Sequence, residues 1–279
     1  NNSEGVDLSK ANIINPYTSD LTKELAEKLY ELRKEKGLTL ESANKLLLED
    51  YMYYACMLVK TGRADGAVSG ACHSSANTLR PALQIIKETF PQIKISIDTF
   101  RAEVAEECIK KFDIDIINDI SGGTFDKNMY NIVANYQKDY ILTHIKGTLQ
   151  TMHLKENATY KNLIEEMLVF FEEKIKMLTE IGCKNIIIDP GFGFAKTTEQ
   201  NYTLLKNLHI FKKWGFPLLV GLSRKSMIWK IIDKTPENAL NGTTVLNTLA
   251  LAQGANILRV HDVQEATETI KLFRTYNNA

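Results

Sequence analysis

The sequence predicts a (β/α)8 barrel of the TIM type, and three observations support this prediction. Short apolar runs alternate with longer amphipathic runs along most of the chain. Several of the short runs are rich in Ile and Val without polar alternation, which is typical of parallel strands covered on both faces. The length of 279 residues suits one such barrel, and no stretch rich in Pro, Gly or Ser divides the chain.

The predicted strands and helices follow one another in order. The strands are expected at residues 11–15, 66–71, 93–98, 114–118, 140–144, 185–189, 217–222 and 257–260. Helical spacing of apolar residues predicts helices over 20–36, 40–61, 75–89, 101–111, 127–137, 160–181, 198–213, 240–252 and 263–275. The first part of the chain is mostly helical, so the first two βα units are expected to be replaced or irregular. Within it, Tyr51, Tyr53, Tyr54 and Met57 are expected in the core.

Composition and charge exclude several classes of partner. The 34 basic and 34 acidic residues give a formal net charge of +0, so nothing indicates a nucleic-acid or anionic-membrane partner. No apolar run approaches the ~18 residues of a membrane span. The first residues, NNSEGVDLSK, lack the basic and apolar regions of a secretory signal.

The cysteines indicate a reducing setting. Cys56, Cys72, Cys108 and Cys183 form no CxxC pair, and their spacing suggests neither a disulfide framework nor a zinc site. Cys56 and Cys108 lie in predicted helices and are expected in or near the core. A cytoplasmic protein fits this usage best.

Polar residues gather where the predicted strands end, and barrels of this type carry their chemistry at that end. These residues are Asp98, Asn118, His144, Asp189, Ser223, Lys225, Arg259 and His261. Each alone has a structural alternative: the aspartates as helix caps, Asn118 in a turn. Likewise, His144 is open to interpretation as a core histidine and Lys225 as a solvated loop residue. Together, however, they bring carboxylates, an amide and cations to one face.

One group of these residues suits a heterocycle. The carboxylates of Asp98 and Asp189 and the amide of Asn118 match the edge of a planar ring that presents amino and ring N–H donors. Because they follow apolar runs, these polar groups are expected to be partly buried and to need partners. Phe194, on a glycine-hinged loop, suits stacking on a ring, with a buried loop aromatic as an equal alternative.

A second group suits an anion. Lys225, Arg259 and His261 are expected to bind phosphate or diphosphate. The glycines of the SGG segment at 121–123 and of the GFG segment at 191–193 allow close approach of backbone to a ligand, although glycine loops alone are weak evidence. The residues therefore predict a heterocycle that carries a diphosphate leaving group.

Around these residues the sequence resembles dihydropteroate synthase. The matching segments are SIDTFRAEVAEECI, IINDISGG, YILTHIKGTLQTMH, IIIDPGFGFAKTTEQNYTLL, PLLVGLSRKSMI, NGTTVLNTLAL and ILRVHDVQEA, in the order of that family, over about residues 90–275. The resemblance implies a barrel enzyme of folate biosynthesis. Such an enzyme joins 4-aminobenzoate to 6-hydroxymethyl-7,8-dihydropterin diphosphate and releases diphosphate, usually with Mg²⁺. It also implies a homodimer formed through the late helices.

The resemblance assigns the pterin side of the site. Asp98, Asn118, Asp189 and Lys225 match residues that hold the pterin, and Met152 matches a wall position of the pterin pocket. Of these, Asp98, Asp189 and Lys225 are the expected catalytic residues.

The resemblance also assigns the remaining contacts. Phe194 matches the aromatic residue of the glycine-rich loop, and Ser223 lies with Lys225 in the SRKS loop beside 4-aminobenzoate. Arg259 and His261 match the pair that binds diphosphate. Asn15, in the loosely similar segment IINPYTSD, is the candidate ligand of Mg²⁺.

The first part of the chain resembles phosphate acetyltransferase instead, over about residues 5–87 and most specifically in ADGAVSGACHSSANTLRPALQ. The catalytic C-terminal region of that family is absent. We therefore expect a chimera, with an acetyltransferase-like segment at 1–89 and a dihydropteroate-synthase-like region at 90–279. Either the first segment supplies strands one and two of a single barrel, or it forms its own subdomain beside an incomplete barrel.

Three functions follow from these patterns. The leading hypothesis is dihydropteroate synthase. The second is an acyltransferase that moves acetyl between coenzyme A and phosphate, which residues His73–Arg80 favour. The third is a catalytically impaired chain that binds pterin.

Overall fold

The computed structural model describes residues 14–63, 83, 85–87, 89–90, 92–147, 151 and 158–279. Contacts divide the chain into two compact units, Asn1–Ile93 and Lys94–Ala279. The sequence boundary expected after residue 89 lies close to this division. Two of the expected strands, at 11–15 and 66–71, lie outside the described residues except for Ile14 and Asn15, which form no strand. Most of the helix expected at 75–89 also lies outside them.

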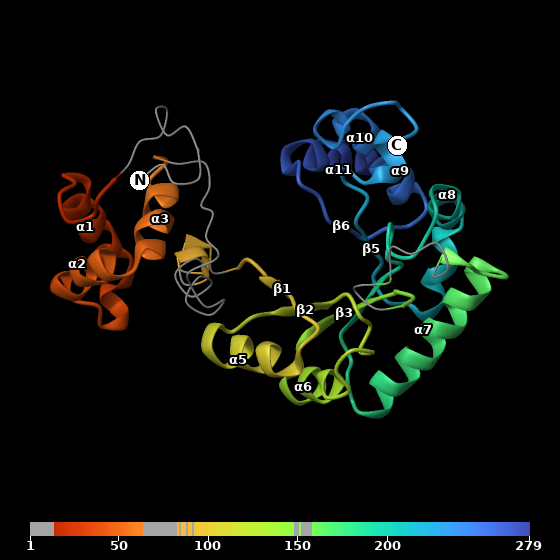
Figure 1. Cartoon of the computed structure of the whole chain (residues 1–279), viewed down its shortest axis with the longest axis horizontal. Helices are drawn as coiled ribbons and strands as arrows, with labels where there is room; N and C mark the ends of the chain where they lie inside the picture. The colour runs from red at the N-terminus through yellow and green to blue at the C-terminus, as the bar shows by residue number, and fades with distance from the viewer. Residues whose placement is uncertain are drawn as a thin grey trace. The chain divides into compact units, whose positions relative to one another are not determined.

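The described part of the first unit is helical. It contains α1 (Leu21–Arg33), a 3-10 turn, α2 (Leu40–Glu49) and α3 (Tyr51–Lys60) (Figure 1). Leu25, Leu29, Leu47 and Met57 are fully buried at their common core. The apolar residues of α1 and α2 recur at helical spacing, so each helix buries one apolar face in this common core.

The single helix expected over 40–61 is broken at Asp50. This residue has extended backbone, and its Oδ1 accepts a hydrogen bond of 3.0 Å from the Met52 amide, which caps α3. The break turns Tyr51 outward, so its predicted core position is wrong. Tyr53 and Tyr54 are buried as predicted.

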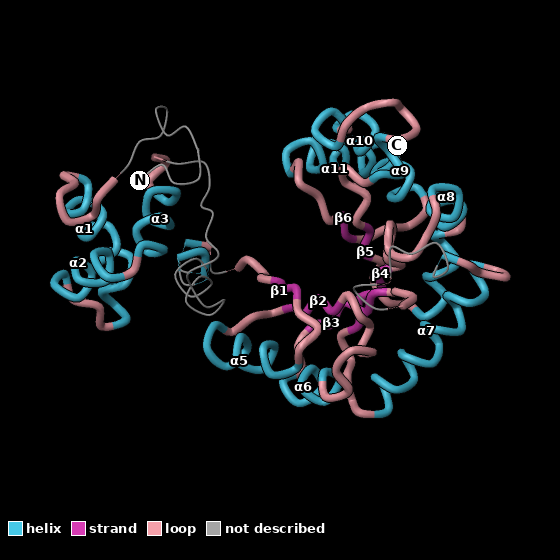
Figure 2. The backbone as a smooth tube through the Cα atoms, in the orientation of Figure 1, coloured by secondary structure: helices cyan, strands magenta, loops and turns pink. Residues whose placement is uncertain are grey.

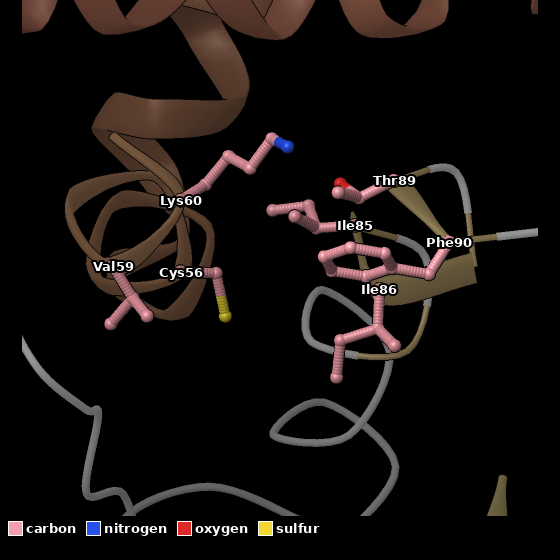
Figure 3. Close-up of a pocket in the computed structure, with 7 residues that line it drawn as sticks. All are labelled: Cys56, Val59, Lys60, Ile85, Ile86, Thr89 and Phe90. Atoms are coloured by element: carbon pink, nitrogen blue, oxygen red, sulfur yellow. The ribbon is translucent and has the colours of Figure 1, made fainter. Parts of the chain in front are cut away.

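A cavity of about 440 Å³ lies in the first unit beside α3. Its described lining is mostly apolar and consists of Cys56, Val59, Lys60, Ile85, Ile86, Thr89 and Phe90 (Figure 3). Burial raises the pKa of the Cys56 thiol to about 11, so this cysteine is a neutral core residue rather than a nucleophile.

The second unit is built on parallel strands in sequence order. Its strands are β1 (Ser96–Asp98), β2 (Ile116–Asp119), β3 (Asp139–Thr143), β4 (Ile186–Asp189), β5 (Leu219–Val220) and β6 (Ile257–Leu258). The first four form one sheet, β5 and β6 form a second, and a parallel bridge between Ile188 and Leu218 joins the two. Each of the six strands predicted from 93–98 onward therefore overlaps an observed strand.

Helices follow the strands and cover them from outside. They include α5 (Ala102–Phe112), α6 (Met129–Tyr136), α7 (Leu163–Glu180), α8 (Thr198–Lys206), α9 (Ser226–Trp229), α10 (Leu240–Ala252) and α11 (Val263–Asn277). Figures 1 and 2 show α5, α6 and α7 along the outer side of the first strands. This βα alternation brings the carboxyl ends of the strands to one face.

The inside of the strand row is apolar. Ile141, Ile187 and Leu219 form a buried cluster contributed by β3, β4 and β5. Cys108 and Cys183 are buried free thiols, as expected for Cys108. In the part of the chain that the structure describes, no helix is long and apolar enough to cross a membrane.

Candidate active site

The first two strand ends place an aspartate beside an asparagine. Asp98 and Asn118 are direct partners in the register of β1 and β2. The Asn118 Nδ2 donates a hydrogen bond of 2.7 Å to Asp98 Oδ1. Asn118 is buried, and its Oδ1 has no partner among the described residues. A buried acceptor without a donor is costly, so this oxygen is suited to an N–H of a bound ligand.

A second carboxylate ends β4. Asp189 is the register partner of Thr143 on β3, and its Oδ1 accepts a hydrogen bond of 2.8 Å from the Gly191 amide. Burial raises the pKa of the Asp189 carboxyl, while the nearby Lys225 ammonium and the Gly191 N–H oppose this rise. Desolvation thus leaves a carboxylate with a strong demand for donors.

Lys225 lies along the loop that follows β4. Its Nζ donates a hydrogen bond to the Phe192 carbonyl and lies 5.0 Å from the centre of the Phe194 ring. Its Cδ is 3.2 Å from the position of a Cβ added at Gly193. Burial lowers the pKa of Lys225, and the attraction of Asp189 opposes this shift. The structure therefore brings Lys225, Phe194 and Asp189 together.

The loops after β5 and β6 are tied to each other. Ser223 Oγ lies 2.8 Å from His261 Nδ1, and Arg224 forms a bidentate ion pair with Asp262 at 2.6 and 3.0 Å. Arg259 Nη2 lies 2.6 Å from Asp98 Oδ2. Arg259, which is expected to bind an anion, therefore lies beside Asp98, which is expected to bind the heterocycle.

Two buried charged residues next to the site were not assigned a role from the sequence. They are Asp119 and Lys196. Asp119 is fully buried and accepts hydrogen bonds from the Ser121 amide and hydroxyl, the Gly123 amide and the Tyr140 hydroxyl. Lys196 is buried and contacts His144. A lone lysine directly after the GFGFA segment was the available signal for Lys196.

His144 follows β3 and is a core residue. It is buried, and its ring packs edge-on against Phe170 with 4.9 Å between ring centres. Burial lowers the pKa of His144 well below its ordinary value, so the ring is neutral. Among the two interpretations of this histidine, the structure favours the structural one.

The glycines of the two loops are needed for packing. A Cβ at Gly123 would lie 2.2 Å from the Tyr130 ring, and a Cβ at Gly191 would lie 2.1 Å from the His144 carbonyl oxygen. Both glycines also have positive φ. Their freedom therefore serves the close approach of neighbouring segments of this chain.

The two remaining predicted site residues are Met152 and Asn15. Met152 lies outside the described residues. Asn15 belongs to the first unit, where its Oδ1 accepts a hydrogen bond of 3.0 Å from the Tyr17 amide in the turn before α1. Among the described residues, no group of three or more His, Cys, Asp and Glu side chains could hold a metal ion. A Mg²⁺ ion held by one or two side chains together with substrate phosphates would need no such group.

Two sequence profiles of known protein families match this chain. The sequence profile described as pterin binding enzyme matches residues 66–261. The chain belongs to the pterin binding enzyme family. A second profile, phosphate acetyl/butaryl transferase, matches residues 1–107. The resemblance to dihydropteroate synthase is thereby confirmed, together with the likeness of the first segment to the acetyltransferases.

Individual relatives of this pterin binding chain are dihydropteroate synthases. The enzyme of a Synechocystis species is 44% identical over 196 residues, which cover 69% of this chain and 66% of that protein. The bifunctional dihydropteroate synthase/dihydropteroate reductase of Helicobacter pylori is 41% identical, over 65% of this chain and 47% of that protein. The chain thus covers less than two thirds of either relative.

A solved structure supports the fold. The dihydropteroate synthase of Clostridium difficile, crystallised in the presence of pteroic acid, has a TM-score of 0.65 and 34% identity, covering 76% of this chain and 80% of that one. The predicted TIM-type (β/α)8 class is confirmed.

Proposed function

We propose that this chain catalyses the dihydropteroate synthase reaction. It would join the amine of 4-aminobenzoate to the methylene carbon of 6-hydroxymethyl-7,8-dihydropterin diphosphate and release diphosphate, as a transferase of folate biosynthesis. The observation that carries this proposal is the placement of Asp98, Asn118 and Asp189 at the ends of parallel strands, with Arg259 2.6 Å from Asp98. Acceptors for a heterocycle and a cation for its leaving group therefore lie side by side.

The pterin would use the acceptors. Its amino group and ring N–H groups would donate to the Asp189 carboxylate, to Asp98 and to the partnerless Asn118 Oδ1. Hydrogen bonds to ionised acceptors are short and strong, and at Asp189 and Asn118 they would satisfy groups that burial otherwise penalises. Phe194, held beside the Lys225 ammonium, would pack against the ring.

The diphosphate would use the cations. Arg259 would exchange its contact with Asp98 for phosphate oxygens, with His261 two residues further along. As the C–O bond breaks, its electron pair leaves with diphosphate, and positive charge develops on the pterin methylene. The nearby carboxylates stabilise this charge, because they are already in place before the reaction.

The second substrate would complete the reaction. Ser223 and Lys225 would position 4-aminobenzoate, whose amine nitrogen forms the new C–N bond and then loses a proton. No covalent enzyme intermediate is needed. Holding the two reactants together removes part of the entropic barrier.

The direct test is release of diphosphate from the dihydropterin substrate with and without 4-aminobenzoate. We expect release that depends on 4-aminobenzoate and matches the dihydropteroate formed. If no diphosphate is released in either condition while 6-hydroxymethylpterin still binds, the chain is a catalytically impaired pterin-binding protein.

A second candidate is acetyl transfer between coenzyme A and phosphate, favoured by the acetyltransferase profile over residues 1–107. It is tested by formation of acetyl-coenzyme A from acetyl phosphate. We expect none, since the chain carries a match to that family only in its first part.

Three further properties stay predictions from the resemblance and the composition. A homodimer through the late helices is supported by exposed apolar residues, with Leu272 and Tyr276 on α11 73% and 79% exposed. A cytoplasmic setting is supported by the free thiols of Cys56, Cys108 and Cys183. Magnesium is supported by the family resemblance alone.

A further inference from the structure

Lys196 makes a saturated set of contacts behind the candidate site. Its Nζ donates to the Gly191 carbonyl at 2.9 Å and to the Phe194 carbonyl at 3.0 Å, and it lies 3.1 Å from His144 Nδ1. An ammonium has three N–H donors, and a neutral imidazole can accept at Nδ1. The His144 ring is neutral, and in the tautomer that carries its proton on Nε2 its Nδ1 accepts, so all three protons of the Lys196 ammonium then have an acceptor.

The two carbonyls that Lys196 holds are the ends of a turn. The Phe194 amide donates to the Gly191 carbonyl at 3.1 Å, which closes residues 191–194 into this turn. Lys225 contacts the residues in between and at its end: the Phe192 carbonyl, the backbone at Gly193 and the Phe194 ring. Lys196 and Lys225 therefore contact different atoms of the same turn, so a shift of the turn at one lysine would displace the contacts of the other.

The turn and the residue that follows it are fixed at two further points. Asn201, which is buried on α8, accepts a hydrogen bond of 2.8 Å from the Gly193 amide. The Tyr160 hydroxyl donates to the Ala195 carbonyl at 3.0 Å. These neutral contacts hold single atoms, whereas Lys196 joins both ends of the turn to the end of β3.

We propose that Lys196 is a positioning residue that acts through the 191–194 turn on Lys225, without touching substrate. Its ammonium fixes the Phe192 carbonyl and the Phe194 ring in the arrangement that aims Lys225 at the pterin. The inference rests on the proposed function, because it assigns a role in pterin binding. Its physical basis is local: a buried lysine persists only where its donors are satisfied, and here the satisfied acceptors are those of the turn.

Burial favours the neutral form of Lys196, so the set of three donated contacts belongs to its ammonium form, which prevails below a pH of about 7. Burial lowers the pKa of Lys196 to about 7, the Asp189 carboxylate opposes this shift, and the Lys225 ammonium adds to it. Lys196, Asp189 and Lys225 are therefore coupled charges, although only the last two lie on the substrate side of the turn.

The test compares Lys196→Met with Lys206→Met, a control at an exposed lysine on α8. Affinity for 6-hydroxymethylpterin is measured by calorimetry for these variants, for Lys225→Met and for the double variant. We expect Lys196→Met to weaken binding about 10- to 100-fold, which is what losing a hydrogen bond between Lys225 and the pterin would cost. In the Lys225→Met background the same change should cost less than about twofold, because its effect passes through Lys225. The proposal would be overturned if the double variant lost affinity by the product of the two single losses, or if Lys196→Met left the affinity unchanged.

A ligand-free measurement separates this proposal from the proposed function. The proton shifts of the Lys225 ε-methylene report the Phe194 ring, and they should move toward those of exposed lysines in Lys196→Met but not in Lys206→Met. Unmoved shifts overturn the positioning role even if the wild type binds no pterin, an outcome that would itself refute the proposed function. Should Lys196→Met not unfold cooperatively, Lys196→Gln, which keeps two N–H donors, is judged by the same two measurements.

Discussion

The Asp98 carboxylate at the end of β1 lies 2.6 Å from the guanidinium of Arg259, which follows β6 and is 161 residues away in sequence. This ion pair joins the first and last described strands of the second unit at their carboxyl ends. Both side chains are more than half exposed, so the pair contributes little to stability. Its importance is functional, because a ligand diphosphate would compete with Asp98 for Arg259.

Replacing Arg259 should separate the two parts of the substrate. We expect Arg259→Ala to weaken binding of the dihydropterin diphosphate by about 10- to 100-fold, since charged hydrogen bonds to phosphate oxygens are lost. Free 6-hydroxymethylpterin should lose far less. Calorimetry with both ligands measures this difference, with the exposed Arg274→Ala on α11 as the control. Equal losses for the two ligands would make Arg259 a structural residue.

Asp189 should decide whether pterin binds. Asp189→Asn replaces the carboxylate by an amide of the same size, and we expect it to reduce affinity for 6-hydroxymethylpterin by roughly 2–4 kcal/mol. Burial raises the pKa of this carboxyl, so on acidification it takes up a proton at a higher pH than an exposed aspartate does. The pterin affinity of the wild type should therefore begin to fall at that higher pH. Titration calorimetry between neutral and acidic pH tests both points. Asp233→Asn is the exposed control, and an unchanged affinity of Asp189→Asn would refute the assignment.

Gly191 should be needed for stability. Gly191→Ala puts a Cβ 2.1 Å from the His144 carbonyl oxygen at a φ of +69°, whereas Gly215→Ala meets nothing within 4 Å at a similar φ of +76°. Backbone strain, about 1–2 kcal/mol, is common to both changes. We expect Gly191→Ala to lower the free energy of unfolding clearly more, measured by urea denaturation. Similar losses for the two variants would show that the loop relaxes without cost.

Lys196 should make stability depend on pH. Its folded-state pKa is about 7, whereas an unfolded lysine titrates near 10.4, so the unfolded state binds more protons between these values. The free energy of unfolding of the wild type should therefore rise with pH in this range relative to Lys196→Met, by at most about 1.4 kcal/mol per pH unit. Lys206→Met should follow the wild type. Parallel curves for wild type and Lys196→Met would contradict the lowered pKa.

Much of the second unit could be predicted from the sequence. Buried parallel strands require unbroken Ile and Val runs, so IIID and IIND marked β4 and β2 directly. Polar residues at the ends of such runs, Asp98 and Asp189, are conspicuous because apolar residues precede them. These positions follow from local sequence alone.

Other features depend on tertiary contacts. The break at Asp50 follows from a side-chain cap that competes with a continuous apolar pattern, and the pattern alone favours one long helix. The position of Lys196 after the GFGFA segment is visible in the sequence, but its burial depends on acceptors that the fold brings to it, the backbone carbonyls of its turn and His144 after β3. The ion pair of Asp98 and Arg259 likewise arises only when the strands are assembled.

We expect the acetyltransferase-like first segment to lower turnover more than pterin affinity. The residues proposed for the pterin, Asp98, Asn118, Asp189 and Lys225, all belong to the second unit, so pterin affinity should be near that of an intact family member. We expect the positioning of 4-aminobenzoate to depend in part on the first two loops, where this sequence departs from the pattern of the family. Misplacement of a reactant by about 1 Å can reduce the rate ~100-fold.

The measurement that tests the central claim most directly is the rate of dihydropteroate formation from dihydropterin diphosphate and 4-aminobenzoate. It is made on this chain and on a version in which the first two strands and loops of the dihydropteroate synthases replace residues 1–89. The account predicts slow formation by the chain, abolished by Asp189→Asn, and a clear gain in the restored version at similar pterin affinity. No product from either version, or formation that survives Asp189→Asn unchanged, would contradict it.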